Sequence, residues 1–276
     1  MTVVEEIQKL KQEKNAVILA HYYVRPEIQD IADYIGDSFY LSKVAVGLKE
    51  QTIVFCGVSF MGESAKVLNP EKTVLMPDMH ADCAMAHMAD AKTIQKMRDT
   101  YEDLAVVCYI NSTAELKTHS DVCVTSANAV KIVKALPNKN IFFIPDKNLA
   151  HFIAEQVPEK NFVYNEGYCP IHEHMQVEEI KAAKAQHPAA EVLAHPECPK
   201  AVLAISDYVE VLPESSTTQR KVRNKSLSSV PKTASATSWK KTIRIRILFY
   251  RDRACLYRYE ADHTGKGSSR LKTGEN

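Results

Sequence analysis

The chain contains no apolar run that approaches the ~20 residues a membrane-spanning helix needs. The opening segment, MTVVEEIQKLKQEKN, predicts a charged amphipathic helix rather than a secretory signal. These two absences favour a cytoplasmic protein with no membrane partner.

The sequence also lacks a glycine-rich nucleotide loop, so nothing in it indicates that NAD binds as a cofactor. Its seven cysteines are an odd number, and no two of them form a CxxC pair. In a chain with cytosolic character this favours metal binding or catalysis over disulfides, although the spacing alone specifies no metal.

The chain has almost no excess of one charge, since 35 Lys and Arg nearly balance 34 Asp and Glu and the formal net charge is +1. It is unevenly distributed, because residues 210–276 hold 15 Lys and Arg against 6 Asp and Glu. A basic tail suggests a nucleic-acid-binding module. The tail has no sustained helical or strand period, which argues against that interpretation and for no nucleic-acid partner.

What the sequence does contain is a motif that occurs three times, at residues 16–38, 105–126 and 191–209. Each copy has an apolar strand, a polar cluster, an amphipathic segment, an Asp and a second short strand. The interval from His21 to Ser38 equals that from Tyr109 to Ser126. Residues just past the carboxyl end of such a strand line the ligand crevice of an α/β unit. Three copies therefore predict three crevices that contribute to one site.

The strands are near-continuous apolar runs, as in parallel strands buried on both faces, and helical patterns lie between them. We expect an α/β fold of three pseudo-symmetric domains with short parallel sheets around a central site. Their limits are predicted at 1–82, 83–166 and 167–276. After Val209 the pattern fails, so the third domain is disrupted there. The segment 27–35 is among the predicted helices.

Three groups of residues are candidates for chemistry. Polar clusters at the strand ends hold His21, Tyr22, Tyr23, Tyr109, Asn111, His195 and Glu197; hydroxyls at the following strands are Ser38 and Ser126; and loop cysteines flanked by His, Asp and Glu are Cys83 and Cys169. A single His at a strand end is more often structural than catalytic. Cys56, Cys108 and Cys123 lie inside apolar strands and are expected to be small buried hydrophobic residues.

Several motifs together resemble the quinolinate synthase family. They are LAHYY, EIQDIADYIGDS, VFCGVSFMGESAKVLNP, VLMPD, CYINS, DVCVTSANA, GYCPIHE and AHPEC, in this order, between about residue 16 and residue 209. The resemblance implies an enzyme of de novo NAD biosynthesis that condenses iminoaspartate with dihydroxyacetone phosphate to quinolinate. It also implies three pseudo-symmetric domains, each donating one cysteine to a central 4Fe-4S cluster, and a functional link to an L-aspartate oxidase.

By resemblance, Cys83 and Cys169 are cluster ligands, and one open iron acts as a Lewis acid. Tyr23 and Glu197 would be the catalytic acid–base residues. The substrate-binding residues would be His21, Ser38, Tyr109, Asn111, Ser126 and His195, whose directed donors suit carboxylate and phosphate groups.

By resemblance, the third cysteine ligand should lie near the C-terminus as the cysteine of a motif like EPVC, which the printed tail lacks, and Cys255 lies in an unrelated context. A lost base after Val209 offers an explanation, because one restored base allows the reading VGSTTRKLDYAK and later EFIIGTE. Two further restored bases, near Ile247 and Arg270, allow EPVCTGM and return to the printed ending. We therefore expect residues 210–270 to be frameshifted. The alternatives are an inactive, poorly metal-binding product of the same gene and a genuinely divergent tail; whether Cys255 can replace the third ligand stays open.

Overall fold

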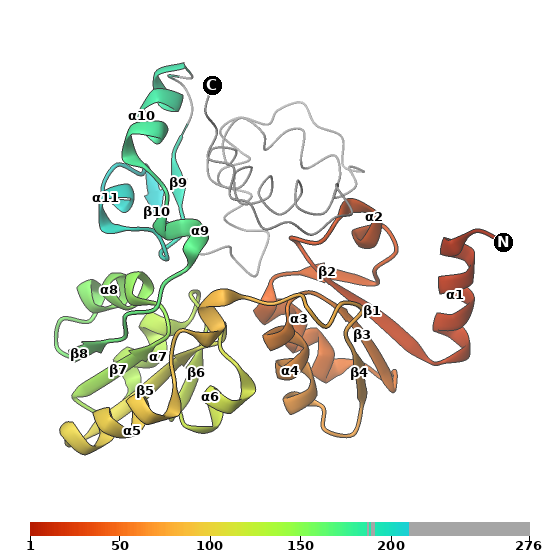
Figure 1. Ribbon diagram of the computed structural model, residues 1–276, viewed down its shortest axis with the longest axis horizontal. Coiled ribbons are helices and arrows are strands. Elements are labelled where there is room, and N and C mark those ends of the chain that lie inside the picture. Colours follow the sequence, from red (N-terminus) through yellow and green to blue (C-terminus); the bar gives the residue numbers. More distant parts are fainter. Residues whose placement is uncertain (187, 189–190, 210–276) are drawn as a thin grey trace.

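The computed structural model describes residues 1–186, 188 and 191–209 (Figure 1). The first α/β unit is a four-stranded parallel sheet in the order β2-β1-β3-β4. Its strands are β1 (Ala16–His21), β2 (Tyr34–Gly36), β3 (Thr52–Cys56) and β4 (Thr73–Leu75). Its helices are α1 (Val3–Glu13), α2 (Pro26–Gln29), α3 (Ser38–Gly47) and α4 (Ser59–Leu68).

The second unit repeats this topology with the strand order β6-β5-β7-β8, again all parallel. Its strands are β5 (Leu104–Tyr109), β6 (Val122–Val124), β7 (Asn140–Ile144) and β8 (Asn161–Tyr164). Its helical segments are η1 (Ala84–His87), α5 (Ala91–Thr100), α6 (Ala114–Thr118), α7 (Ala129–Ala135) and α8 (Lys147–Gln156). The α/β prediction is confirmed for these two units.

The third unit is partial within the described residues. It pairs β9 (Leu193–Ala194) with β10 (Tyr208–Val209) in parallel and carries α9 (Pro170–Glu173), α10 (Val177–Gln186) and α11 (Lys200–Leu203). Figure 1 shows it next to the second unit, with α9 leading into it. The frameshift predicted for residues 210–270 and the role of Cys255 lie outside the described residues, and the predicted domain limits stay a prediction.

In each repeat, one aspartate links the first strand to the second. Asp33, Asp121 and Asp207 precede the second strand of their units, and each accepts the backbone N–H of a residue at the first strand. Those donors are Ile18, Val106 and Val192, at 2.7–2.8 Å. Each carboxylate also forms an ion pair with a basic residue of the helix before the first strand of its unit. These residues are Lys11 of α1, Arg98 of α5 and Lys184 of α10. The same device in all three places supports a common origin for the three strand pairs.

The sheet of the second unit is buried on both faces, as its apolar runs predicted. Every residue of β5 is buried. One face packs Val107 and Phe143 in a core with α7 and α8, and the other packs Val106 and Phe142 with α5 and α6. Burial on both sides explains why this strand reads as continuously apolar rather than alternating.

Two local predictions are wrong. The helix expected at 27–35 is a single turn, α2, and the chain enters β2 at Tyr34. Cys123, expected to be buried, is exposed because β6 is the edge strand of its sheet, whereas Cys108 is fully buried as expected. Among the described residues, no helix has the length and apolar character needed to cross a membrane.

The first two units contact each other through α4 and α6. The side chain of Glu63 accepts the N–H of Ala114 at 2.7 Å, and Lys117 Nζ donates to Ser64 Oγ at 2.8 Å. Cys83, in the segment that connects the units, packs against the cores of both. This places one of the predicted cluster ligands at the junction of the two units.

Candidate active site and cluster ligands

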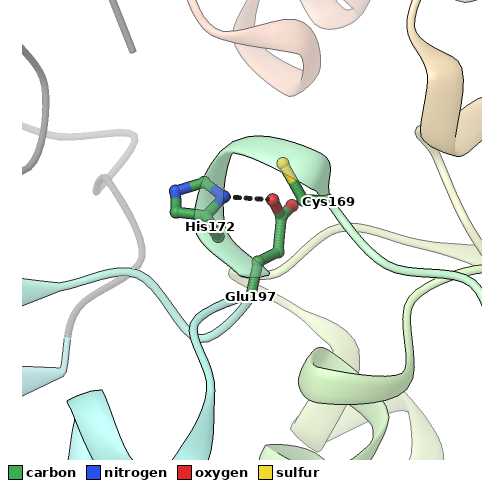
Figure 2. A group of neighbouring side chains, drawn as sticks. All are labelled: Cys169, His172 and Glu197. Carbon is green, nitrogen blue, oxygen red and sulfur yellow. Dashed lines mark ion pairs between the residues drawn. The ribbon is translucent and has the colours of Figure 1, made fainter. Parts of the chain in front are cut away.

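The candidate site is centred on Cys169, His172 and Glu197, whose ligating atoms all lie within 4.8 Å of one another (Figure 2). Cys169 and His172 are separated by one turn of α9, while Glu197 comes from the loop after β9. His172 Nδ1 lies 2.9 Å from Glu197 Oε2. A thiol, an imidazole and a carboxylate converge here, although Glu197 is distant in sequence from the other two.

The second unit fixes the position of Cys169. Asp146, which is fully buried, caps α8 by accepting the N–H of Leu149 at 2.7 Å and accepts the N–H of Cys169 at 3.0 Å with its other oxygen. Asn148 of the same helix donates to the backbone oxygen of Glu197 at 3.1 Å. The start of α8 therefore holds both the cysteine and the glutamate loop.

Tyr109 joins the second unit to Glu197 directly. Its hydroxyl, at the carboxyl end of β5, donates to Glu197 Oε1 at 2.7 Å. Both side chains are buried, with 5% and 4% of their surfaces exposed. The structure thus brings together two of the predicted site residues that stand 88 positions apart.

The two histidines of the third unit surround the same carboxylate. His195 Nδ1 lies 3.9 Å from Glu197 Oε1, and the rings of His195 and His172 stack with centroids 5.3 Å apart. The backbone N–H of Glu197 donates to His195 Nδ1 at 3.3 Å. Glu197 therefore has an imidazole near each of its oxygens.

This environment keeps Glu197 ionised. Burial alone would raise the pKa of Glu197, but the adjacent imidazoles of His195 and His172, together with the hydrogen bond from Tyr109, lower it below its usual range. Burial and then the Glu197 charge raise the pKa of Tyr109, so its hydroxyl keeps the proton that it donates. The arrangement supplies a desolvated carboxylate with a fixed orientation.

Opposing effects also act on the pKa of Cys169. Burial and the Glu197 charge raise the pKa of its thiol, while the backbone N–H groups of His172 and Ile171 at the start of α9 oppose this. A charge on Cys83 acts in the same direction as burial, and the net result is a pKa of Cys169 well above its usual value. Cys83 itself precedes η1 as Cys169 precedes α9, so both thiols stand at the first turn of a short helix.

Residues of the first unit form a second group. His21 is buried, and its ring packs edge-on against that of Tyr23 with centroids 4.5 Å apart, while Tyr23 is 48% exposed. The backbone N–H of Tyr23 donates to His21 Nδ1 at 3.2 Å, which repeats the His195–Glu197 contact of the third unit. Ser38 begins α3 behind the capping residue Asp37. The meeting of this group with Glu197 in one site stays a prediction.

Ser126 and Asn111, the remaining predicted residues, belong to the second unit. Burial raises the pKa of Tyr109, and a hydrogen bond with the Ser126 side chain opposes this with a smaller effect. Asn111 is half-buried just beyond the end of β5. Both flank Tyr109, and their binding of substrate stays a prediction.

Sequence reasoning missed His172 and Asp146 as site residues. The spacing Cys169-x-x-His172 was visible, and on a helical turn it places both side chains on one side. Asp146 carries no local signal in the sequence. The signal that sets it apart is its complete burial, which requires the fold.

Comparison with known proteins shows which function similar chains serve. The family profile described as "Quinolinate synthetase A protein" matches residues 5–228. A quinolinate synthase from Fusobacterium nucleatum is 57% identical over 205 residues, covering 74% of this chain and 69% of the relative.

The chain belongs to the quinolinate synthase family.

Other members extend the match. The quinolinate synthases of Clostridioides difficile and Clostridium perfringens (strain ATCC 13124) are 55% and 53% identical over 204 and 209 residues. These alignments cover 74% and 76% of this chain, and 67% and 69% of the relatives. The expected assignment to a quinolinate synthase of NAD biosynthesis is confirmed. The profile match continues into residues 210–228, beyond the last described residue, Val209.

Proposed function

We propose that the chain carries the site at which iminoaspartate and dihydroxyacetone phosphate condense to quinolinate. The observation that supports this most strongly is the buried Glu197, held ionised beside the Cys169 thiol by Tyr109 and His172. A desolvated carboxylate in contact with directed donors is suited to moving protons during a condensation and dehydration.

The donor set also fits a 4Fe-4S cluster. Cys83 and Cys169 would each supply a thiolate from the first turn of a short helix. Bound iron would keep both ionised, although burial and the Glu197 charge raise the pKa of the free Cys169 thiol. The third thiolate would come from a residue outside the described part of the chain. When bound, the cluster supplies an open iron that acts as a Lewis acid toward substrate oxygen or nitrogen.

Glu197 serves as the base in this proposal. Its carboxylate is ionised and can therefore accept a proton, and His172 and Tyr109 fix the direction in which its oxygens point. Tyr23, whose side chain is exposed to incoming substrate, would exchange protons as the second acid–base residue.

The remaining residues would bind the substrate oxyanions. His21 and Ser38 of the first unit, Asn111 and Ser126 of the second, and His195 of the third offer imidazole, hydroxyl and amide donors. Three pseudo-symmetric units around one central site would bring these donors together. The equivalent His21 and His195 contacts support this arrangement.

We also propose that the printed tail results from lost bases in the gene. In that case the printed chain lacks the third ligand and is the inactive product already named as the alternative, whereas the chain with restored frame is the enzyme. The hypothesis of a nucleic-acid-binding tail is not needed, because the basic charge follows from misread codons.

The test uses the frame-restored protein purified without oxygen and supplied with both substrates. Glu197→Gln should leave the cluster bound and reduce quinolinate formation by ~10²–10⁴-fold, the usual contribution of a general acid or base. Glu102→Gln, at an exposed position of the second unit, is the matched control and should keep full activity. Equal activity in the two variants would remove Glu197 from the mechanism.

A further inference from the structure

Two cysteines outside the candidate site face each other across neighbouring strands. Cys108 of β5 and Cys123 of β6 are register partners in the parallel sheet. Adjacent strands lie ~4.8 Å apart, and register partners point to the same face. That spacing falls within the ~4.4–6.8 Å between Cα atoms that a disulfide accepts. The backbone therefore places the two thiols where they can bond.

The two thiols differ in exposure. Cys108 is completely buried, whereas Cys123 lies on the edge strand and is exposed. An oxidant in solution can reach the Cys123 sulfur, whereas the neighbouring Cys108 sulfur is covered by the protein and cannot meet other thiols. Packing as a small hydrophobic residue accounts for Cys108 but not for a cysteine at the exposed position.

The charge around the pair favours one thiolate. The hydrogen bond between the two thiols raises the pKa of Cys123 and lowers that of Cys108 to about 7 against the opposing effect of burial. The hydroxyls of Ser112 and Ser120 and the ammonium of Lys117 act in the same direction. Lys117 is anchored from the other side by Ser64 Oγ at 2.8 Å and by the ring of Phe60.

The other two units show that the fold does not need cysteine here. The equivalent register pair is Ala20 and Ile35 in the first unit and Ala194 and Val209 in the third. Both pairs are apolar, so the two strands pair at this position without cysteine. The cysteine pair is a property of the second unit alone among the three described strand pairs.

We propose that Cys108 and Cys123 form a reversible disulfide when the protein meets a hydroperoxide. The pair holds one negative charge, which lies on Cys123 when the shared proton crosses the hydrogen bond to Cys108. The exposed Cys123 thiolate attacks one peroxide oxygen and becomes a sulfenic acid, and the oxygen that leaves takes the proton from Cys108 as water or alcohol. The Cys108 thiolate then attacks that sulfur, the S–S bond forms, and hydroxide leaves to take up a proton as water. The two thiols lose two electrons in total, and the O–O bond of the peroxide accepts them.

The bond would be readily reduced again. A disulfide prefers a Cβ separation of ~3.8 Å, about 1 Å less than the strand spacing, so closing it strains the sheet. Strained and exposed disulfides are the labile ones. Because Cys108 directly precedes Tyr109, the strain would act on the hydroxyl that holds Glu197; this last consequence, unlike the bond itself, rests on the proposed function.

The test treats the full frame-restored chain, without oxygen, with one equivalent of hydrogen peroxide, then alkylates free thiols and digests with trypsin. Cleavage after Lys117 separates the two cysteines, so their disulfide joins peptides 99–117 and 118–131. We expect this linked pair to be about tenfold more abundant than any pair containing Cys56 or Cys198, since a thiol of pKa near 7 is far more ionised than an ordinary one. Dithiothreitol should remove it.

Two controls keep the outcome decisive. Cys56→Ser, at the end of β3, should leave the linked peptide unchanged, whereas Cys123→Ser should abolish it. Oxidation of the guanidinium-unfolded chain should distribute the bonds among many pairs, which would show that the fold selects this one. If Cys108 and Cys123 are both recovered alkylated from the folded chain after peroxide, the proposal is wrong, whatever the effect on quinolinate formation.

Discussion

Removing the Tyr109 hydroxyl tests the central contact between the second and third units. In Tyr109→Phe, Glu197 Oε1 loses its donor at 2.7 Å and keeps only His195, whose Nδ1 at 3.9 Å is beyond hydrogen-bonding distance. The other oxygen, Oε2, keeps its contact with His172 Nδ1 at 2.9 Å, so the carboxylate loses one of its two close partners and retains the second.

The expected cost follows from that geometry. A hydrogen bond to a charged group contributes ~1.5–3 kcal/mol, and the burial of both partners places this one toward the upper end. For a protein of this size, each kcal/mol lowers the melting temperature by ~2–4 °C. We therefore expect Tyr109→Phe to melt about 3–12 °C below the parent chain.

The assay is thermal unfolding of the frame-restored protein followed by circular dichroism. Tyr34→Phe is the matched control, because Tyr34 is 38% exposed and the change should stay within ~0.5 kcal/mol. In combination with Glu197→Gln, the two losses should be clearly less than additive, because one removes the donor and the other the charge of the same hydrogen bond. Additive losses, or a Tyr109→Phe protein as stable as the Tyr34→Phe control, would refute the reasoning.

Three further predictions concern the ligands, the acid–base residue and the gene. Cys83→Ala and Cys169→Ala should each abolish the brown absorbance of the reconstituted cluster while Cys56→Ala keeps it, and an intact cluster in either of the first two would contradict the ligand assignment. Tyr23→Phe should reduce turnover by ~10²–10⁴-fold without loss of iron or sulfide, so undiminished turnover would exclude it as an acid–base residue. DNA sequencing across codons 209–271 should reveal three missing bases; an unaltered reading frame would establish the printed tail.

The strand pairs could be predicted from the sequence because their signals are local. The apolar run, the polar cluster and the aspartate follow one another within some twenty residues of each repeat. Asp33 and Asp121 had visible positions before the second strands, and the structure supplies the physical reason, which is the N–H of the neighbouring strand. Burial of Cys108 followed from the same local pattern.

The contacts of the site depend on how distant segments meet, which local patterns do not determine. Tyr109 and Glu197 each appeared as candidates, but their hydrogen bond spans two units. His172 contributes only because α9 turns it toward the loop that carries Glu197. The exposure of Cys123 depends on the order of strands in the sheet, since the same residue in a central strand would be covered.

The most direct measurement compares quinolinate formation by two proteins, each reconstituted with iron and sulfide in the absence of oxygen. One is the printed chain and the other is the chain with the restored reading frame. We expect the restored protein to convert iminoaspartate and dihydroxyacetone phosphate to quinolinate, while the printed chain binds little iron and forms none. A restored protein that holds its cluster and yet makes no quinolinate would contradict this expectation.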